Sequence, residues 1–497
     1  MSRLRLLGFL CFLVLNIVNG NAEKIYYAHP SLHLYFTLNT ETKEAVLGGE
    51  DFGYGEGNAL VFPPIGESWP DTTWVNITIP ETIIYKNEPY VVVGVAADAF
   101  LKKTVVKKIS LPETVTYIGP NAFSWCVNLK QINIPSKVTE IASSTFYFCQ
   151  YLESIVLPHG IKRILNSAFG DCWRLKKISI PGTCTYIGND AFTGCNSLSN
   201  IVLEDGDEPL TCGYSYALSR SYQGPDRPRH RGLFADAPAD TVYIGRNLLV
   251  DVTEWGEVYK PFLTFHNYPN SIEGDIHLST GKFFDEVRFG DKVTTITDSL
   301  FCESTIRNEV ILPPKLKHIG KRSFSSSLEQ AYLTIPDSVS FIGEYAFEKC
   351  GISVLKILGP CENWETGTFD RCAPIWLIVG EAVKVIPRFY FSDLRYIECL
   401  PQTPPFAVNQ FGVTPIIVAD GAGSTYRDQW PDAIIVDKLD EVVTVNVKTP
   451  GSFYSRLLAQ DYQLDNVYKL KLKGSINDVD WEALSSMSKV YSYDFSE

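Results

Sequence analysis

Hydrophobic side chains recur along the chain with a period of 23 residues. The most regular member of the pattern is a phenylalanine, which occupies positions Phe100, Phe123, Phe146, Phe169 and Phe192. A stretch of alternating apolar residues follows each one, as in 129–135, which holds Leu, Ile and Ile at every second or third position and ends in Pro. This alternation predicts one strand per repeat. The proline ends the strand because it cannot donate to a strand ladder.

The other half of each repeat has a looser pattern. In 138–149 it carries Ile141 and Phe146 inward and predicts a turn-rich run. A period of roughly 20–29 residues with leucine at fixed offsets is typical of leucine-rich repeats, in which each repeat is one turn of a solenoid. The predicted fold class is therefore a leucine-rich repeat solenoid, a β-rich α/β right-handed coil with a parallel sheet on its concave side.

The period is interrupted in the middle of the chain. It breaks after Phe192 and resumes at Phe301, with one further counterpart at Phe234. The gaps predict two insertions, over about 205–233 and 247–284.

A segment without the period precedes the repeats, which are expected over 79–440. Residues 23–78 combine an alternating strand at 34–38 with many glycines and prolines, so we expect a β-rich N-terminal cap. The first repeat is longer than the others, and a hairpin at 85–90 would hold the additional residues.

A second segment without the period follows the repeats, over 441–497. It holds alternating stretches at 443–447 and 468–472, which predict strands, and a short helix is expected at 453–458. This is the pattern of a small C-terminal α/β module or terminal cap.

The repeat resembles a known family at two blocks. Ile118–Cys126 has the form Ile-Gly-x-x-Ala-Phe-x-x-Cys, and Leu129–Pro135 has the form Leu-x-x-Ile-x-Ile-Pro. These blocks are similar to those of the BspA-like leucine-rich repeat proteins of bacterial and some protist cell surfaces. The resemblance implies a secreted or surface-displayed adhesin that binds proteins, other cells or glycans, and it supplies no catalytic residues. The chain departs from the pattern at its insertions and at Gly245 and Gly290, which replace the proline, so a smooth concave surface is not expected there.

The first 22 residues have the organisation of a cleavable signal peptide. Arg3 and Arg5 precede an apolar run over 6–18, and small residues follow up to Ala22, after which we expect cleavage. The run is shorter than the roughly 20 residues that span a bilayer, so a retained anchor is the weaker alternative. Lipidation at Cys11 is the other alternative. The predicted location is secreted or at the cell surface, and no later stretch is apolar enough to be a transmembrane segment.

Charge narrows the range of partners. The 497-residue chain has a formal net charge of −13, and loss of the signal peptide would make it about −15. Nonspecific nucleic-acid binding depends on basic surface that contacts phosphates. We therefore expect no nucleic-acid partner.

The cysteines are expected to be structural. Of the 12, 11 remain without Cys11, so at least one must be a thiol or pair between chains. Six occupy the same slot of the repeat, which favours a ladder of small buried side chains, although disulfides along the ladder are a second possibility. A zinc site is not expected because no Cys-x-x-Cys pair occurs. The six are Cys126, Cys149, Cys172, Cys195, Cys350 and Cys372.

Motifs for catalysis are absent from the sequence. The seven histidines show no metal-binding spacing, and neither a nucleophile elbow nor a phosphate-binding loop occurs. We therefore predict no catalytic residue, no metal and no cofactor. The glycine-rich stretch 53–57 is better explained as a flexible loop than as a nucleotide site. The acidic stretch 204–208 would suit calcium, but a solvated turn explains it better because a full ligand set is lacking.

Two sets of residues are candidates for binding. The first consists of strand residues that alternate with the buried ones and are mostly polar and uncharged, which suits hydrogen bonding to a peptide or glycan as well as it suits a solvated sheet face. It comprises the column Lys108, Gln131, Ser154, Lys177 and Asn200 and the column Ser110, Asn133, Val156, Ser179 and Val202.

The second set lies in the first insertion, which is basic and aromatic on an acidic chain. Tyrosine and arginine are enriched in binding hot spots, and long loops on rigid scaffolds commonly carry function. The alternative is a solvated loop whose tyrosines pack on the solenoid. The candidates are Tyr214, Tyr216, Arg220, Tyr222, Arg227, Arg229, His230 and Arg231.

The sequence therefore predicts a non-enzymatic, secreted or surface-displayed repeat protein that binds an extracellular protein or glycan. One rival is a glycan-binding protein with an aromatic platform that includes Tyr214 and Tyr222. The other is a glycoside hydrolase, which would need a cleft with two carboxylates within about 10 Å of each other.

Overall fold

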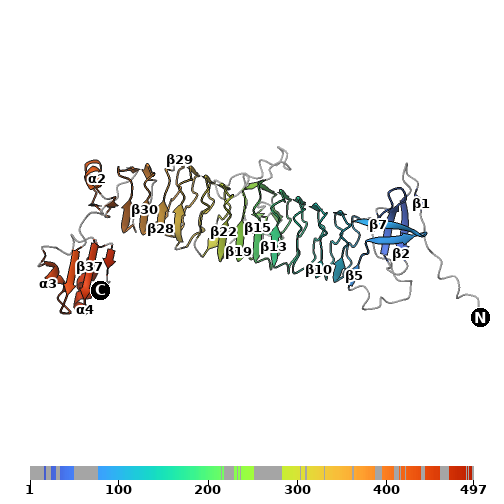
Figure 1. Ribbon diagram of the computed structural model, residues 1–497, viewed down its shortest axis with the longest axis horizontal. Helices are drawn as coiled ribbons and strands as arrows, with labels where there is room; N and C mark the ends of the chain where they lie inside the picture. Colours follow the sequence, from blue (N-terminus) through green and yellow to red (C-terminus); the bar gives the residue numbers. More distant parts are fainter. Residues whose placement is uncertain are drawn as a thin grey trace, which may run out of the picture. The chain divides into compact units, whose positions relative to one another are not determined.

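The structure is a computed structural model of the chain, and Figure 1 shows it as a ribbon. It divides into two compact units, Met1–Leu328 and Glu329–Glu497, which are described separately below. The structure describes residues 16–17, 24–29, 34–49, 76–213, 215–217, 229–231, 233–234, 237–250, 283–302, 304–307, 310–329, 331–360, 363–386, 394–407, 414, 416–419, 421–431, 433–437, 443–458, 460, 469–487, 490 and 492–494.

An antiparallel meander begins the first unit. Its strands are β1 (Asn16–Ile17), β2 (Lys24–His29), β3 (Leu34–Asn39) and β4 (Glu44–Leu47). Every second residue of β3 is buried, with Leu34, Phe36 and Leu38 at most 1 % exposed, which confirms the alternating strand predicted there. β1 lies within the predicted signal peptide, whose cleavage position at Ala22 is outside the described residues.

A hairpin joins this meander to the repeats. It consists of β6 (Thr82–Tyr85) and β7 (Glu88–Val95), and β7 pairs in parallel with β4. The two loop residues, Lys86 and Asn87, have φ values of 50° and 63°. Two consecutive positive φ angles are typical of the type I′ turn that matches strand twist. The predicted hairpin is therefore confirmed.

The first half of each repeat supplies a strand to a parallel sheet. One sheet orders β10 (Gln131–Ile132), β8 (Lys108–Ser110) and β5 (Asn76–Thr78). A second sheet orders β13 (Lys177–Ile180), β15 (Asn200–Leu203), β19 (Thr241–Ile244) and β22 (Glu286–Phe289), which lie side by side in Figure 1. The repeat strands predicted from the alternation are therefore present.

The second half of each repeat also forms a parallel sheet, which the sequence did not predict. Most of its strands have only two residues, which are too few to alternate visibly. β9 (Tyr117–Ile118) pairs with β7. The others are β11 (Glu140–Ile141), β12 (Arg163–Ile164), β14 (Tyr186–Ile187), β16 (Leu210–Cys212) and β20 (Leu248–Val250).

The phenylalanines stack in the turns that close each repeat. Neighbouring rings from Phe100 to Phe192 lie 5.3 to 5.6 Å apart between centroids and are within 18° of parallel. Phe234 continues the stack at 5.1 Å from Phe192, which confirms it as a counterpart. All of these rings are buried. The backbone supports the stack, since the amide of Phe146 donates to the carbonyl of Ala168 in the next repeat at 2.8 Å.

The solenoid extends further into both predicted insertions than the sequence suggested. β16 lies inside 205–233 but pairs with β14, and β20 lies inside 247–284 but pairs with β16. The repeat was hidden there because cysteine replaces the usual isoleucine at Cys212. The first insertion then contains a hairpin of β17 (Ser215–Ala217) and β18 (Arg229–Arg231).

Regular repeats resume at the end of the second insertion. β21 (Phe283–Phe284) pairs with β24 (Thr305–Ile306), and β23 (Thr295–Ile296) pairs with β25 (His318–Ile319). Phe284 is fully buried and takes the position that leucine holds in other repeats. This substitution concealed the repeat from the sequence pattern.

The second unit opens with a six-stranded parallel sheet. Its order is β26 (Ala331–Ile335), β28 (Ile352–Ile357), β30 (Trp376–Val379), β32 (Tyr396–Cys399), β34 (Ile416–Val418) and β35 (Ile435–Asp437). Shorter pairs accompany it, β27 (Phe341–Ile342) with β29 (Asn363–Trp364) and β31 (Val385–Ile386) with β33 (Phe406–Ala407). Helix α2 (Gly423–Gln429) lies in the last repeat.

A small α/β module ends the second unit. β36 (Val443–Val447), β37 (Lys469–Gly474) and β38 (Ser492–Asp494) form a parallel sheet, and α3 (Phe453–Leu458) and α4 (Asp478–Ser485) accompany it. Val445, Phe453, Leu457 and Leu484 belong to one buried cluster. The leucine-rich repeat solenoid, the β-rich cap and the α/β module predicted from the sequence are all present, and α4 is an addition.

Candidate functional site

The first predicted column of strand residues is in register. Gln131 pairs with Lys108 in one sheet, and Lys177 bridges Ser154 and pairs with Asn200 in the other. All except Asn200 are exposed. The amide of Asn200 donates to the hydroxyl of Thr241 at 2.7 Å, so part of its hydrogen-bonding capacity serves the fold.

The second column is less available to a ligand. The side-chain amide of Asn133 both accepts from the amide of Leu111 and donates to its carbonyl, each at 2.8 Å. The Ser179 hydroxyl donates to the Glu204 carboxylate at 2.6 Å. Val156 is 81 % exposed, and it presents an apolar group to solvent.

The candidate residues of the first insertion are only partly described. The β17–β18 register opposes Tyr216 to His230 and Ser215 to Arg231. The hairpin therefore brings residues from both ends of the insertion together. Tyr214, Arg220, Tyr222 and Arg227 lie outside the described residues.

The acidic stretch 204–208 does not assemble into one site. Glu204 accepts hydrogen bonds from Ser179 and from the amide of Gly182. Asp205 accepts from the hydroxyl of Tyr243 at 2.8 Å, and Asp207 pairs with Lys292 at 2.5 Å. Because Glu204, Asp205 and Asp207 have different partners, the turn interpretation fits better than the calcium interpretation.

Asp205 also explains why glycine replaces proline at two positions. A Cβ on Gly245 would lie 2.5 Å from the amide nitrogen of Asp205, and one on Gly290 would lie 2.4 Å from its carboxylate. Contacts this short leave no room for a side chain. The departure from the repeat pattern is therefore a local packing requirement.

An exposed aromatic cluster lies on the turns of three adjacent repeats, and the sequence interpretation missed it. The rings of Trp125 and Phe148 stack with centroids 3.9 Å apart, and Trp173 meets Phe148 edge-on at 5.5 Å. Trp125 is 38 % exposed and Trp173 is 42 % exposed. The only sequence signal is that the three positions are separated by 23 and 25 residues.

Two of these aromatic residues occupy an unfavourable backbone region. Trp125 and Phe148 have φ values of 60° and 62°, and the next two repeats place Asp171 and Gly194 at the same point with positive φ. A bulky side chain in the left-handed region costs roughly 1–2 kcal/mol. The solenoid is therefore not what favours aromatic residues at these two positions.

Cationic side chains lie beside the aromatic cluster. The Arg174 guanidinium stacks over the ring of Tyr151 at 4.1 Å. Lys176 pairs with the Glu153 carboxylate at 3.0 Å. The pKa of Glu153 is lowered by Lys176 first, and by Arg174 and Lys130 as well, so three cations surround one carboxylate.

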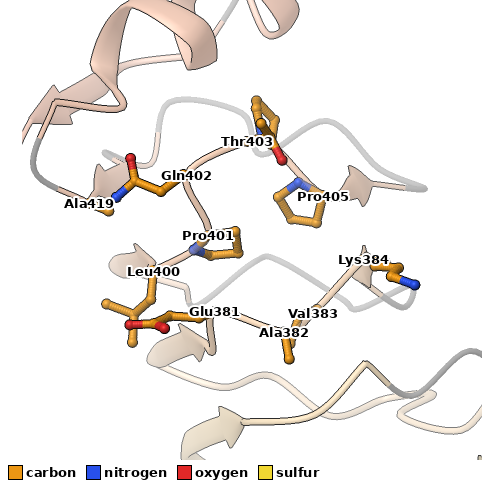
Figure 2. Close-up of a pocket in the computed structure, with 11 residues that line it drawn as sticks. Glu381, Ala382, Val383, Lys384, Leu400, Pro401, Gln402, Thr403, Pro405 and Ala419 are labelled. Atoms are coloured by element: carbon orange, nitrogen blue, oxygen red, sulfur yellow. The ribbon is translucent and has the colours of Figure 1, made fainter.

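A cleft of about 870 Å³ lies in the second unit. Figure 2 shows that most of its lining comes from the segments 381–384 and 400–405, with Ala419 added from a third segment. The lining contains a single carboxylate, Glu381. A glycosidase needs two, so this cleft does not have the residues that the hydrolase alternative requires.

The described residues contain neither a metal-binding cluster nor a membrane-spanning helix. In the described part of the chain, no three His, Cys, Asp or Glu side chains are arranged to hold a metal ion. Among the described helices, none combines the length and apolar character that a membrane crossing requires. The described cysteines all carry thiols rather than disulfides, as the ladder interpretation predicted.

Three solved structures are similar to this chain. A leucine-rich repeat protein from Bacteroides ovatus is 19 % identical, with a TM-score of 0.41 and coverage of 82 % of this chain and 98 % of that chain. A leucine rich cell surface protein from Faecalibacterium prausnitzii is 18 % identical, with a TM-score of 0.34 and coverage of 92 % and 97 %. The pneumococcal vaccine antigen PcpA is 14 % identical, with a TM-score of 0.29 and coverage of 85 % and 98 %.

The family is assigned from the repeats. No curated protein matches the chain. The model of the BspA type leucine rich repeat region matches residues 94–215 and 272–398 with six copies, just over half of the chain. These ranges contain the stacked rings from Phe100 to Phe192 and most of the strands of the repeats. The chain therefore belongs to the BspA type leucine-rich repeat family.

Proposed function

We propose that the protein is a non-catalytic recognition protein, secreted or displayed at a cell surface, that binds an extracellular protein. The observation that carries this proposal is the exposed first column, in which Lys108, Gln131, Ser154 and Lys177 stand in register on rigid strands. A repeated row of hydrogen-bonding groups supplies a continuous surface. An interface of standard size needs about 800 Å² per partner, and a face of several repeats is large enough to supply it.

The first insertion would add specificity. Its hairpin pairs β17 with β18, and its sequence is rich in tyrosine and arginine. These side chains dominate the binding free energy of many interfaces. Arg220, Arg227 and Arg231 are the residues that we would change first.

The secreted location rests on the N-terminal sequence. An apolar run over 6–18, preceded by arginines and followed by small residues, favours cleavage after Ala22. Mass spectrometry of the exported protein would test this directly. A mature N-terminus at residue 23 is expected, and an exported protein that retains residues 1–22 would contradict it.

The binding proposal is tested with labelled mature protein on matrix-coated surfaces and intact cells. The Arg220→Ser, Arg227→Ser, Arg231→Ser variant and a Gln131→Glu, Ser154→Glu variant should each bind less without a lower melting temperature. A Thr139→Glu, Thr185→Glu variant is the matched control, since both residues are exposed on the second half of the repeat. Unchanged binding by both test variants would show that neither surface takes part.

A further inference from the structure

The part of the first unit between residues 97 and 203 is basic although the whole chain is acidic. Between residues 97 and 203 the chain has eleven Lys or Arg and six Asp or Glu, whereas its overall net charge is −13. The cations gather next to the first-half strands, and the backbone places some of them in contact. The amide of Lys130 donates to the carbonyl of Lys107 at 2.8 Å, and the amide of Lys176 donates to the carbonyl of Glu153 at 3.1 Å.

These cations and the aromatic cluster form one surface, which we call the basic-aromatic strip. It consists of Lys107, Lys130, Arg174 and Lys176 together with Trp125, Phe148, Tyr151 and Trp173. Arg174 connects the two parts, since it stacks on Tyr151 and directly follows Trp173, which contacts Phe148. With roughly 4.8 Å between repeats, the cations from Lys107 to Lys176 span roughly 14 Å.

The basic-aromatic strip contains more cationic side chains than carboxylates. Three of its four cations, Lys176, Arg174 and Lys130, act on one carboxylate, Glu153, whose side chain is 46 % exposed and pairs with Lys176. Clustered like charges destabilise a fold unless a counter-ion relieves them. Trp125 is likewise exposed at a position where the backbone favours other residues, and Trp173 is exposed beside Phe148. Neither feature serves the solenoid, and both suit a ligand that carries negative charge and flat faces.

We propose that the basic-aromatic strip binds a linear acidic polysaccharide, with its acid groups on the lysines and arginine and its sugar rings against Trp125 and Trp173. Charge complementarity selects an anionic ligand. A protein partner suits the strip less well, because the core of a protein interface is depleted in lysine. This inference does not depend on the protein partner proposed above, since the strip shares no residue with the first column.

The spacing of the cations in the strip suits an acidic polysaccharide better than a nucleic acid. A nucleic-acid strand carries one charge per roughly 3.4 Å, whereas the strip offers four cations over roughly 14 Å with one carboxylate among them. Asn128 lies two positions before Lys130 and adds side-chain amide groups. Such groups suit a ligand rich in hydroxyls and with sparser charge.

The test measures binding of the mature full chain to polygalacturonate oligomers by calorimetry, in low salt. Neutral dextran oligomers and a single-stranded DNA with the same number of charges serve as comparison ligands. We expect binding to polygalacturonate that weakens as salt rises, weaker binding to DNA, and none to dextran.

Substitutions within the basic-aromatic strip test whether it is the binding site. Lys107→Ser, Lys130→Ser, Lys176→Ser together should weaken binding about tenfold, since each exposed pair contributes only modestly. Trp125→Asn with Trp173→Ser should also weaken it, and asparagine tolerates the backbone angle at 125. Glu153→Gln should tighten binding about twofold to threefold, because it removes the competing carboxylate.

A matched control removes equal charge elsewhere in the same unit. Lys137→Ser, Lys162→Ser, Lys315→Ser changes three exposed lysines outside the strip and should leave binding within twofold of wild type. Circular dichroism and the melting temperature verify that every variant is folded. Absence of polygalacturonate binding, an equal loss in the control, or tighter binding to DNA would each overturn the proposal, while the protein-binding assay on cells would remain a separate result.

Discussion

Arg246 donates a hydrogen bond of 2.6 Å from Nη1 to the carbonyl oxygen of Cys184, which lies 62 positions earlier in the chain. The same guanidinium donates to the carbonyls of Gly182 at 2.7 Å and Pro181 at 2.9 Å. Arg246 is only 1 % exposed. Arg246, which lies between the two insertions, therefore satisfies three backbone carbonyls of a turn two repeats earlier.

Arg246→Met should destabilise the first unit by roughly 3 kcal/mol. Each buried carbonyl that loses its donor costs about 1–3 kcal/mol of unfolding free energy. Methionine also removes the buried charge, which offsets part of that cost. Urea unfolding followed by circular dichroism measures the change. Arg288→Met is the control, since the Arg288 side chain is 71 % exposed, and its effect should stay within about 0.5 kcal/mol. Equal stability of both variants would mean that the hydrogen bonds only balance the cost of burying the charge.

Phe146→Ala should cost about 3–5 kcal/mol of unfolding free energy, because it leaves a cavity in the middle of the phenylalanine stack. Phe146 lies 5.6 Å from Phe123 and 5.3 Å from Phe169 between ring centroids. Phe146→Leu keeps most of the volume and should cost about 1–2 kcal/mol. Val156→Ala is the control, since Val156 is 81 % exposed. A leucine variant as unstable as the alanine variant would show that ring stacking, rather than volume, holds the repeats together.

The cysteine ladder should resist alkylation in the folded protein. Burial raises the pKa of Cys126 to about 12, and its thiol donates to the carbonyl of Phe100 at 3.0 Å. Burial also raises the pKa of Cys149, Cys172 and Cys195. The thiolate is the reactive form, so these four should remain unmodified by iodoacetamide at pH 8.

Cys302 provides the comparison within the same chain, because it is only half-buried. Peptide mass spectrometry should find Cys302 modified before the ladder cysteines, and all of them modified in urea. Rapid labelling of Cys149 in the native protein would contradict a packed ladder. It would indicate that the repeats open locally on the timescale of the reaction.

The repeating parts of the fold were predictable because one period fixes many residues. Phe123, Leu129 and Ile132 recur at constant offsets, so each repeat confirms the others, and burial of all three follows. The second sheet was not predictable, since strands such as Glu140–Ile141 are too short to alternate. The same limit hid β16, where Cys212 replaces isoleucine.

The candidate surfaces were predictable only where they follow the period. The first column was predicted from the alternation of buried and exposed residues on the strands, and the structure pairs its residues as expected. The basic-aromatic strip follows the period only in part, since Lys107, Lys130 and Lys176 share one position of the repeat, whereas Trp173 lies two positions beyond the one that Trp125 and Phe148 share. Arg174 and Tyr151 are one period apart and so meet because the repeats stack, but the pattern of apolar residues does not mark either position as a binding residue. Arg246 was equally hidden, because its partners lie more than 60 positions away.

Asp480 should make the C-terminal α/β module sensitive to acid. Its carboxylate accepts from the amides of Gly451 at 2.6 Å, Phe453 at 2.8 Å and Asn477 at 3.1 Å. Burial on its own raises the pKa of Asp480, but these three donors outweigh it and the pKa is lowered below its ordinary value of 3.8. A lowered pKa in the folded state means that the stabilisation is complete above pH 3.8 and is lost as the pH falls through the lower folded-state value.

Asp480→Asn should therefore destabilise the module by about 2–3 kcal/mol at pH 7, because the amide group would direct its own N–H groups at backbone donors. Hydrogen exchange of residues 443–494 between pH 7 and pH 3 measures both effects, after correction for the intrinsic exchange rate. In the wild type, protection should fall towards pH 3, and in the variant it should be low throughout. Asp478→Asn is the control, since Asp478 is exposed in the first turn of α4 and contributes only about 0.3–1 kcal/mol through the helix dipole. Equal protection from hydrogen exchange in both variants at pH 7 would show that the hydrogen bonds of the Asp480 carboxylate do not stabilise the starts of α3 and α4.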